Sequence, residues 1–254
     1  MLYALGEADR IAGISGFTVR PPEARRDKPK ISGFSSGKLE RILAVEPDLV
    51  LAFSDLQADM CRDLVRAGIE VHVFNQRSID GILRMIVTTG ALVGRAAEAQ
   101  ALVTDLARGL DAARARGEAR IARNRRRLRV YFEEWDAPLI SGIRWVSELI
   151  TLAGGEDVFA DFATRHSATE RRIDDPLEVV ARAPEIIIGS WCGKKFQPDH
   201  LRARPGWADV PAVAHDRLYE IKSPLILAPG IAALTDGLAA LEACLDAALG
   251  DGAA

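Results

Sequence analysis

The chain contains one local pattern twice, once in each half. Residues 42–52 (ILAVEPDLVLA) and 179–189 (VVARAPEIIIG) each combine the apolar end of a helix, a proline, an acidic residue and an aliphatic run. Proline pushes the preceding residue out of the helical region, and an apolar run without polar alternation is typical of a parallel strand buried on both faces. Two such units predict two α/β layers in one chain.

The segments around these patterns continue the alternation of helices and strands. The first half predicts a short helix over 2–10 closed at Gly6, a strand over 11–16, a turn-rich loop over 21–37, a helix over 58–68 and a strand over 69–75. The second half predicts strands over 127–135, 185–191 and 217–222 and helices over 147–155, 177–184 and 234–249. Strands that alternate with helices are typical of parallel sheets.

Between the two halves, residues 78–126 contain no proline and are rich in alanine, leucine, arginine and glutamate, which favour helices. We expect a first helix to about Leu92 and then one helix of about 30 residues, about 45 Å long, which acts as a rigid spacer. The predicted fold class is therefore α/β. Two small Rossmann-like lobes with mainly parallel sheets, residues 1–92 and 127–254, are joined by one long helix, residues 93–126.

Composition and charge exclude several classes of protein. With 254 residues, 48% hydrophobic content and a net charge of −3, the chain folds around a core and has no strong field for nucleic acid. The arginine-rich run 112–129 is interpreted as a solvated helix end, with a nucleic-acid patch as the alternative. No apolar run reaches the roughly 18 residues that a membrane-spanning helix needs. Three cysteines without CxxC spacing and four scattered histidines predict neither a disulfide framework nor a metal site.

No catalytic motif is present in the sequence, whether nucleophile elbow, phosphate-binding loop, dinucleotide fingerprint or zinc-protease helix. Cys192, in a loop with aromatic residues and lysines, is the best candidate for a nucleophile, but no histidine lies near it in sequence. Glu133, Glu134 and Asp136 could form a general acid/base pair, although carboxylates at a strand end are more often hydrogen-bonded surface. We therefore favour a binding protein, with no catalytic residues, over an enzyme.

Candidate binding residues follow the buried strands, because ligands of open α/β sheets lie outside the carboxyl ends of the strands. Two lobes that face each other would form a cleft there. The candidates from the two lobes are aromatic or apolar residues and lysines: Phe17, Phe34 and Phe53, then Trp135, Leu139, Trp191, Lys194, Lys195 and Lys222. This mixture indicates a broad, flat, apolar ligand with negative or hydrogen-bonding groups at its edge. The alternative is that residues 190–196 form a solvated loop whose tryptophan packs on its lobe.

Six motifs, in order, resemble those of one known family: YALGEADRIAGIS, PPEA, GFSSGKLERILAVEPDLVLAF, ISGIRWVSELITLAGGEDVF, LEVVARAPEIII and RPGWADVPAVAHDRLYEI. The family is the helix-linked (class III) periplasmic substrate-binding proteins, which deliver cobalamin, iron-siderophores or haem to ABC importers. The segments PPEA, GFSSGKLERI and PLISGIRWVSELITLAGGEDVF are most similar to the cobalamin-binding members. The resemblance implies a monomer that binds a corrinoid such as cobalamin between its lobes and delivers it to a membrane permease.

Individual site residues also follow from this resemblance. Phe17, Phe34, Phe53 and Leu139 fall where the cobalamin-binding members present aromatic residues to the corrin, and Glu40 falls where the family has its N-lobe glutamate for docking on the permease. The C-lobe docking position holds Leu177, with Glu178 one residue later and Asp175 as another candidate. Lys222 and Ile226 stand where the cobalamin binder has an acidic and a basic ligand contact, which departs from the family pattern.

The resemblance also bears on compartment and leaves alternatives open. The family begins with a strand before the segment YALG, preceded by a signal peptide or lipoprotein anchor, and neither is visible here. We expect a periplasmic protein from the family, with a late start or a cytosolic variant as alternatives. An iron-siderophore or haem binder is the alternative within the class. A cytosolic corrinoid-handling protein or an enzyme on the same fold is the alternative from another class.

Overall fold

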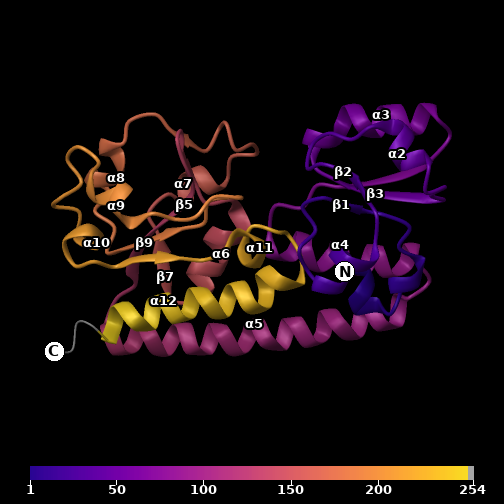
Figure 1. Ribbon diagram of the computed structural model, residues 1–254. Helices are drawn as coiled ribbons and strands as arrows, with labels where there is room; N and C mark the ends of the chain where they lie inside the picture. Colours follow the sequence, from indigo (N-terminus) through magenta and orange to yellow (C-terminus); the bar gives the residue numbers. More distant parts are fainter. Residues whose placement is uncertain (251–254) are drawn as a thin grey trace. The chain divides into compact units, whose positions relative to one another are not determined.

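The computed structural model describes residues 1–250, and their contacts divide the chain into two units. Unit 1 comprises residues 1–76 and 83–101, and unit 2 comprises residues 77–82 and the chain from Leu102 onwards. Each unit has strands and helices of its own (Figure 1). No helix within residues 1–250 is both long enough and apolar enough to cross a membrane.

Unit 1 is built from short elements. Its strands are β1 (Ile14–Ser15), β2 (Lys30–Ser32), β3 (Leu49–Phe53) and β4 (Glu70–Phe74). Its helices are two 3-10 turns (Leu2–Leu5 and Ala8–Arg10), α1 (Pro22–Asp27), α2 (Leu39–Leu43), a 3-10 turn (Asp55–Gln57), α3 (Ala58–Arg66) and the part of α4 (Ile79–Leu92) from Leu83 onwards. Among the described residues of this unit, β1 pairs with β2 and β3 pairs with β4, both in parallel, as two separate sheets.

The expected loop over 21–37 is wrong in part, because it contains both α1 and β2. Pro22 stands at the start of α1, where its missing N–H is not needed and its fixed φ suits a helix. The residues that follow it, Glu23 to Arg26, are good helix formers. The prolines and glycines of this segment therefore mark the ends of two short elements.

The repeated pattern forms the same structure in both units. In unit 1, α2 is followed by Glu46 with φ 47° and then, after Pro47, by β3. In unit 2, α8 (Leu177–Ala181) is followed by Ala183 with φ 41° and then, after Pro184, by β9 (Ile186–Gly189). Both residues before proline thus leave the right-handed helical region for the left-handed one, which turns the chain from helix into strand.

Unit 2 contains a larger sheet. Its strands are β5 (Leu128–Asp136), β6 (Leu139–Ser141), β7 (Gly155–Asp157), β8 (Arg172–Ile173), β9 and β10 (Leu218–Glu220). Its helices are α6 (Arg144–Leu152), α7 (Ala160–Ala163), α8, α9 (Pro198–Arg202), α10 (Pro211–Ala214), α11 (Ser223–Ile226), a π-helical turn (Ala233–Gly237) and α12 (Leu238–Gly250). The strand order is β10-β9-β5-β6-β8, with β7 also paired to β5.

The central strand β5 is parallel to β9 and β7, whereas β6 is antiparallel to β5 and to β8. The mainly parallel sheet that the sequence predicts is confirmed for β5, β7, β9 and β10, and the antiparallel edge is an addition. One face of the sheet is covered by a buried cluster that includes Tyr131, Phe159 and Trp207. Strand β9 is fully buried, as its apolar run predicts.

The long helix is α5 (Ala96–Asn124), 29 residues in length. Within unit 2 it lies along α12 (Figure 1). Ion pairs join the two helices. The Arg116 guanidinium donates to both carboxylate oxygens of Glu242, at 2.9 and 2.7 Å, and the guanidinium of Arg120 donates to Glu242 at 2.9 Å and to Asp246 at 2.7 Å. Burial raises the pKa of Glu242, but these hydrogen bonds outweigh burial and hold the pKa below its ordinary value.

Several arginines of the run 112–129 are therefore paired with acidic groups within unit 2. Arg126, just after α5, likewise donates to both carboxylate oxygens of Glu185, at 2.5 and 2.6 Å. Charges that are already paired within the fold attract phosphate groups less strongly.

Candidate functional site

Two phenylalanines form an exposed pair on unit 1. Phe17 follows β1 and Phe34 follows β2, so both lie beyond the carboxyl ends of two paired parallel strands. Their rings meet edge to face, with centroids 5.9 Å apart, and the residues are 59% and 48% exposed. Ser15 ties the two loops together, because its Oγ accepts from the Phe17 N–H (3.2 Å) and donates to the Gly33 carbonyl (3.0 Å). An exposed, paired aromatic surface of this kind is suited to a flat apolar ligand.

Phe53 is joined to this pair through a residue that the sequence analysis missed. Phe53 is the last residue of β3, and its N–H donates to Oε1 of Gln57 at 2.8 Å. The amide nitrogen of the same Gln57 side chain donates to the Phe34 carbonyl at 2.5 Å. Unit 1 therefore brings the three predicted phenylalanines into one hydrogen-bonded group of loops. A polar residue four positions after a strand has no distinctive sequence signal, which is why Gln57 was not predicted.

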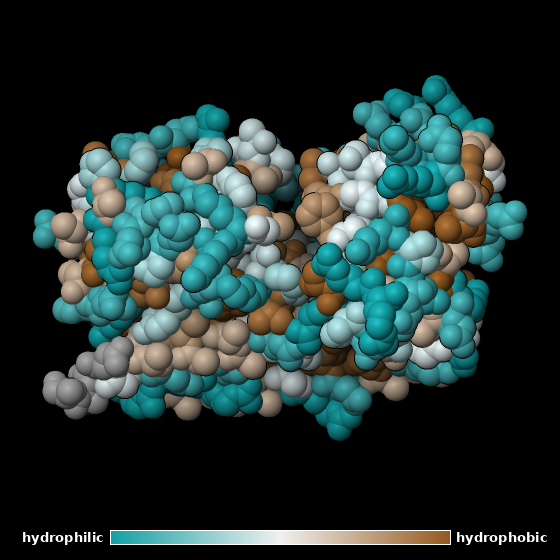
Figure 2. Space-filling view, viewed as in Figure 1, coloured by the Kyte–Doolittle hydropathy of each residue, from teal (hydrophilic) through white to brown (hydrophobic). Residues whose placement is uncertain are grey.

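The apolar surface of the molecule is divided into separate areas. On the face drawn in Figure 2, hydrophobic residues occur as brown areas among hydrophilic ones over each unit. Other large apolar side chains of unit 1, such as Val65 on α3, are also exposed. Exposure alone does not define a site, so the position of Phe17 and Phe34 at strand ends is the informative observation.

On unit 2 the predicted apolar residues differ in exposure. Trp135, near the end of β5, is half-buried, and its Nε1–H donates to the Ala137 carbonyl at 2.9 Å. Leu139 and Trp191 are only 6% and 3% exposed and belong to the buried cluster, where the Trp191 ring packs on Phe196. These two residues lie beneath the surface of unit 2. They pack under the surface residues and have little solvent-accessible area of their own. For Trp191, this is the packing that the alternative interpretation of residues 190–196 describes.

Lys194 covers the tryptophans. Its Nζ lies 2.5 Å from Oδ2 of Asp136, and 4.9 and 5.5 Å from the ring centroids of Trp191 and Trp135. These distances fit a cation held by a carboxylate and by two aromatic faces. Lys222 also has an acidic partner, since its Nζ lies 2.6 Å from Glu220. Of the three lysines of the predicted site, Lys194 and Lys222 are therefore paired with carboxylates, and Lys195 is exposed.

A buried ion pair lies under Trp191. Glu133 is 0% exposed and accepts from the guanidinium of Arg204 at 2.6 and 2.9 Å and from Nε1 of Trp191 at 3.1 Å. The Arg204 guanidinium also lies over the Trp207 ring, 4.5 Å from its centroid. Burial raises the pKa of Glu133, against the opposing effect of Arg204 and the Trp191 N–H. Arg204 could not be recognised from the sequence, because it lies 71 residues along the chain from its partner.

The acid/base candidates are all engaged in ion pairs. Glu133 is bound by Arg204, Glu134 by Arg171 at 2.6 Å, and Asp136 by Lys194. In these pairs the three carboxylates have a structural role within unit 2. Cys192 is exposed in the loop after β9. Within residues 1–250, no group of three or more histidine, cysteine or acidic residues could hold a metal ion.

The predicted docking residues lie on separate helices. Glu40 is exposed on α2, and Glu178 is half-buried in α8, where its carboxylate accepts from Arg182 at 2.6 Å. Asp175 accepts from the Leu177 N–H at 2.9 Å, and the Leu177 side chain is 52% exposed. The alternative acidic residues of this region therefore already have partners within unit 2.

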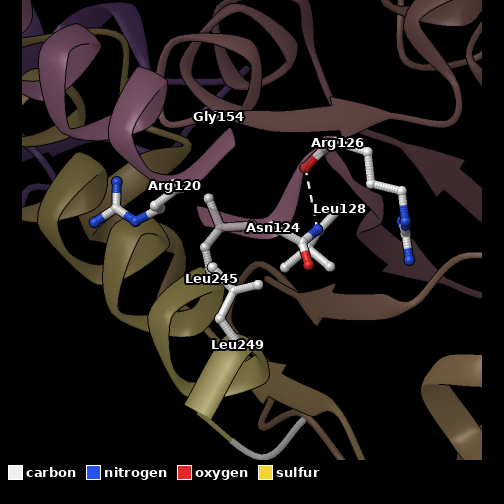
Figure 3. Close-up of a pocket in the computed structure, with 7 residues that line it drawn as sticks. All are labelled: Arg120, Asn124, Arg126, Leu128, Gly154, Leu245 and Leu249. Atoms are coloured by element: carbon white, nitrogen blue, oxygen red, sulfur yellow. Dashed lines mark hydrogen bonds between the residues drawn. The ribbon is translucent and has the colours of Figure 1, made fainter. Parts of the chain in front are cut away.

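A small cavity in unit 2 lies elsewhere, between the C-terminal ends of α5 and α12 (Figure 3). Its lining includes Arg120, Asn124 and Leu245, and Asn124 donates to the Arg126 carbonyl at 3.0 Å. Even with the open solvent at its mouth included, the empty volume is only about 180 Å³. Ligand pockets usually begin at about 300 Å³, so this cavity is too small for the broad ligand that the sequence predicts.

Known proteins are similar to this chain over most of its length. A family model described as periplasmic binding protein matches residues 1–225. The vitamin B12-binding protein of Vibrio parahaemolyticus is 25% identical over 235 residues, which cover 89% of this chain and 78% of that protein.

Two solved structures share the fold. The periplasmic vitamin B12-binding protein BtuF of Vibrio cholerae has a TM-score of 0.75 at 20% identity, and the match covers 98% of this chain and 92% of the other. The periplasmic haem-binding protein RhuT from Roseiflexus sp. RS-1 has a TM-score of 0.78 at 22% identity, with 96% and 94% covered. The predicted fold class, α/β with one long helix, is confirmed by these similarities and by α5.

Proposed function

We propose that this chain, which belongs to the periplasmic binding protein family, is the substrate-binding component of an ABC importer and that its ligand is a corrinoid. Members of this family bind solutes, so the expectation of a binding protein and not an enzyme is confirmed. The observation that carries the choice of ligand is the exposed Phe17 and Phe34 pair at the ends of β1 and β2. A corrin ring offers a flat apolar face to such a pair and amide groups around its edge.

Further support comes from unit 2 and from the relatives. The half-buried Trp135 and the lysine that covers it provide a second surface with apolar and polar parts, of the kind that an amide-bearing ring can contact. The relative in Vibrio parahaemolyticus binds vitamin B12 by its name, and 25% identity over 89% of this chain favours the same class of ligand. We propose that the Trp135 surface of unit 2, like the phenylalanine surface of unit 1, is a ligand-binding surface.

We expect the double variant Phe17→Ala and Phe34→Ala to bind dicyanocobinamide about tenfold more weakly than the parent protein. Each substitution removes exposed aromatic surface that the ligand would cover, at about 25 cal/mol per Å² of apolar area. Isothermal titration calorimetry measures the loss. The matched control is Val65→Ala, which truncates another exposed apolar residue of unit 1 and should leave the affinity unchanged. Equal affinities for the parent and the double variant would remove the phenylalanines from the site.

We propose that the protein acts in the periplasm as a monomer and that Glu40 docks on basic groups of the permease. The charge-reversing variant Glu40→Lys should abolish most corrinoid uptake by cells while the purified variant binds the ligand normally. Repulsion between like charges at the docking surface is the physical reason. The control is Glu46→Lys, which reverses another charge just beyond α2, at the residue before Pro47. Normal uptake with Glu40→Lys would contradict the docking role.

A further inference from the structure

We propose that Asp136 is a specificity-determining residue of unit 2, because its carboxylate neutralises Lys194 and so selects against ligands with carboxylates at their edge. The inference rests on the proposed function only in taking the surface around Trp135 as a ligand-binding surface. The charge of the ligand is a property that the proposed function does not specify.

The geometry fixes Lys194 in one place. Asp136 ends β5, its side chain is 8% exposed, and its Oδ2 lies 2.5 Å from the Lys194 Nζ. The ammonium group also contacts the rings of Trp135 and Trp191, at 5.5 and 4.9 Å from their centroids. A carboxylate that is nine-tenths buried is stable only with a compensating charge, so Asp136 and Lys194 hold each other.

The second carboxylate oxygen of Asp136 supports the same conclusion. Its Oδ1 is buried without a hydrogen-bond partner among the described residues. The carboxylate therefore depends on the Lys194 ammonium for its stabilisation. A ligand carboxylate that approached Lys194 would compete with the buried Asp136 carboxylate for the same ammonium group.

Two further ion pairs of unit 2 are balanced in the same way, and the neighbouring Lys195 is exposed. The lysine after β10, Lys222, is paired with Glu220 at 2.6 Å, and Glu134 is paired with Arg171 at 2.6 Å. Beneath them, Glu133 is paired with Arg204. A ligand edge made of amides can exchange hydrogen bonds with such pairs without displacing a charge. At Lys194, an edge made of carboxylates would have to break the pair with Asp136 or accept repulsion from it, which disfavours haem propionates and acidic siderophores.

Two probes that share one ring test the inference. Dicyanocobinamide carries amide side chains on its corrin, and dicyanocobyrinic acid carries carboxylates on the same corrin. For the parent protein, calorimetry should show tighter binding of the amide form. The variant Asp136→Asn removes the negative charge with little change of shape, and it should shift the affinity ratio about fivefold towards the carboxylate form. Because Lys194 is partly exposed, the shift should shrink as ionic strength rises.

Matched variants separate a local effect from a general one. Asp105→Asn makes the same change in net charge on the exposed face of α5, where it frees Arg108, and it should not change the ratio. In the double variant Asp136→Asn with Lys194→Gln, the affinity ratio should return to that of the parent, because the ammonium group that lost its carboxylate partner is also removed. Thermal melting followed by circular dichroism establishes that each variant is folded.

Each outcome decides between the inference and the proposed function. If the parent binds cobinamide and Asp136→Asn leaves the ratio unchanged, the inference is overturned and the function stands. If the parent binds neither probe and Asp136→Asn binds the carboxylate form, the inference is supported and the corrinoid assignment fails. If neither protein binds either probe, both are contradicted.

Discussion

The variant Arg204→Met should have a free energy of unfolding about 3–5 kcal/mol lower than that of the parent protein. Glu133 has no exposed surface, and the two hydrogen bonds from Arg204 are its main compensation for burial. Methionine is similar in length but carries no charge, so the Glu133 carboxylate would remain buried without its cationic partner. Urea unfolding followed by circular dichroism measures the difference.

Two further variants control this prediction. Arg202→Met removes an arginine two residues away that pairs with the exposed Asp199, and it should cost less than about 1 kcal/mol. In the double variant Arg204→Met with Glu133→Gln, the buried charge is gone, and a large part of the lost stability should return. If Arg204→Met cost no more than Arg202→Met, Glu133 could not depend on this ion pair.

The variant Gly117→Ala should be about 2 kcal/mol less stable than the parent, although alanine normally favours a helix. Gly117 lies within α5, where the helix backbone touches the turn after α6. A Cβ at this position would lie 2.9 Å from the Ala153 carbonyl carbon and 2.9 Å from the Gly154 nitrogen, both of them backbone atoms that cannot rotate away. Gly154 has a φ of 92°, so the turn cannot easily adjust.

The matched control lies on the same helix. A Cβ at Gly109 would meet no atom within 4 Å, so Gly109→Ala should stabilise the protein by about 0.5–1 kcal/mol. Thermal melting of the two variants compares them directly. The prediction requires opposite signs, and a stabilising Gly117→Ala would contradict the close approach of α5 to the turn after α6.

Elements with strong local signals could be predicted from the sequence. The apolar runs after Pro47 and Pro184 form β3 and β9, and the proline-free arginine- and alanine-rich stretch forms α5. These signals depend on a few neighbouring residues, such as a helix that must end before proline. In contrast, the antiparallel pairing of β6 with β5 and β8 depends on residues far apart in the chain. Two- and three-residue strands carry too little periodicity to be recognised.

In the candidate site, too, local features could be predicted and features that depend on distant residues could not. Phe17, Phe34 and Phe53 were predicted from their places near strand ends and from the family resemblance, and the structure links them through Ser15 and Gln57. The burial of Trp191 was predicted only as the alternative, because it depends on Phe196, Lys194 and the ion pair below it. The neutralisation of Lys194 by Asp136 joins residues that are 58 positions apart. Position along a strand is a local property, whereas exposure and charge pairing come from the tertiary fold.

The most direct measurement is a calorimetric titration of the purified protein with cyanocobalamin, with haem and a ferric hydroxamate siderophore as parallel ligands. The proposed function predicts one-to-one binding of cyanocobalamin that is tighter than binding of the other two ligands. Binding of haem or the siderophore with no heat from cyanocobalamin would contradict the corrinoid assignment.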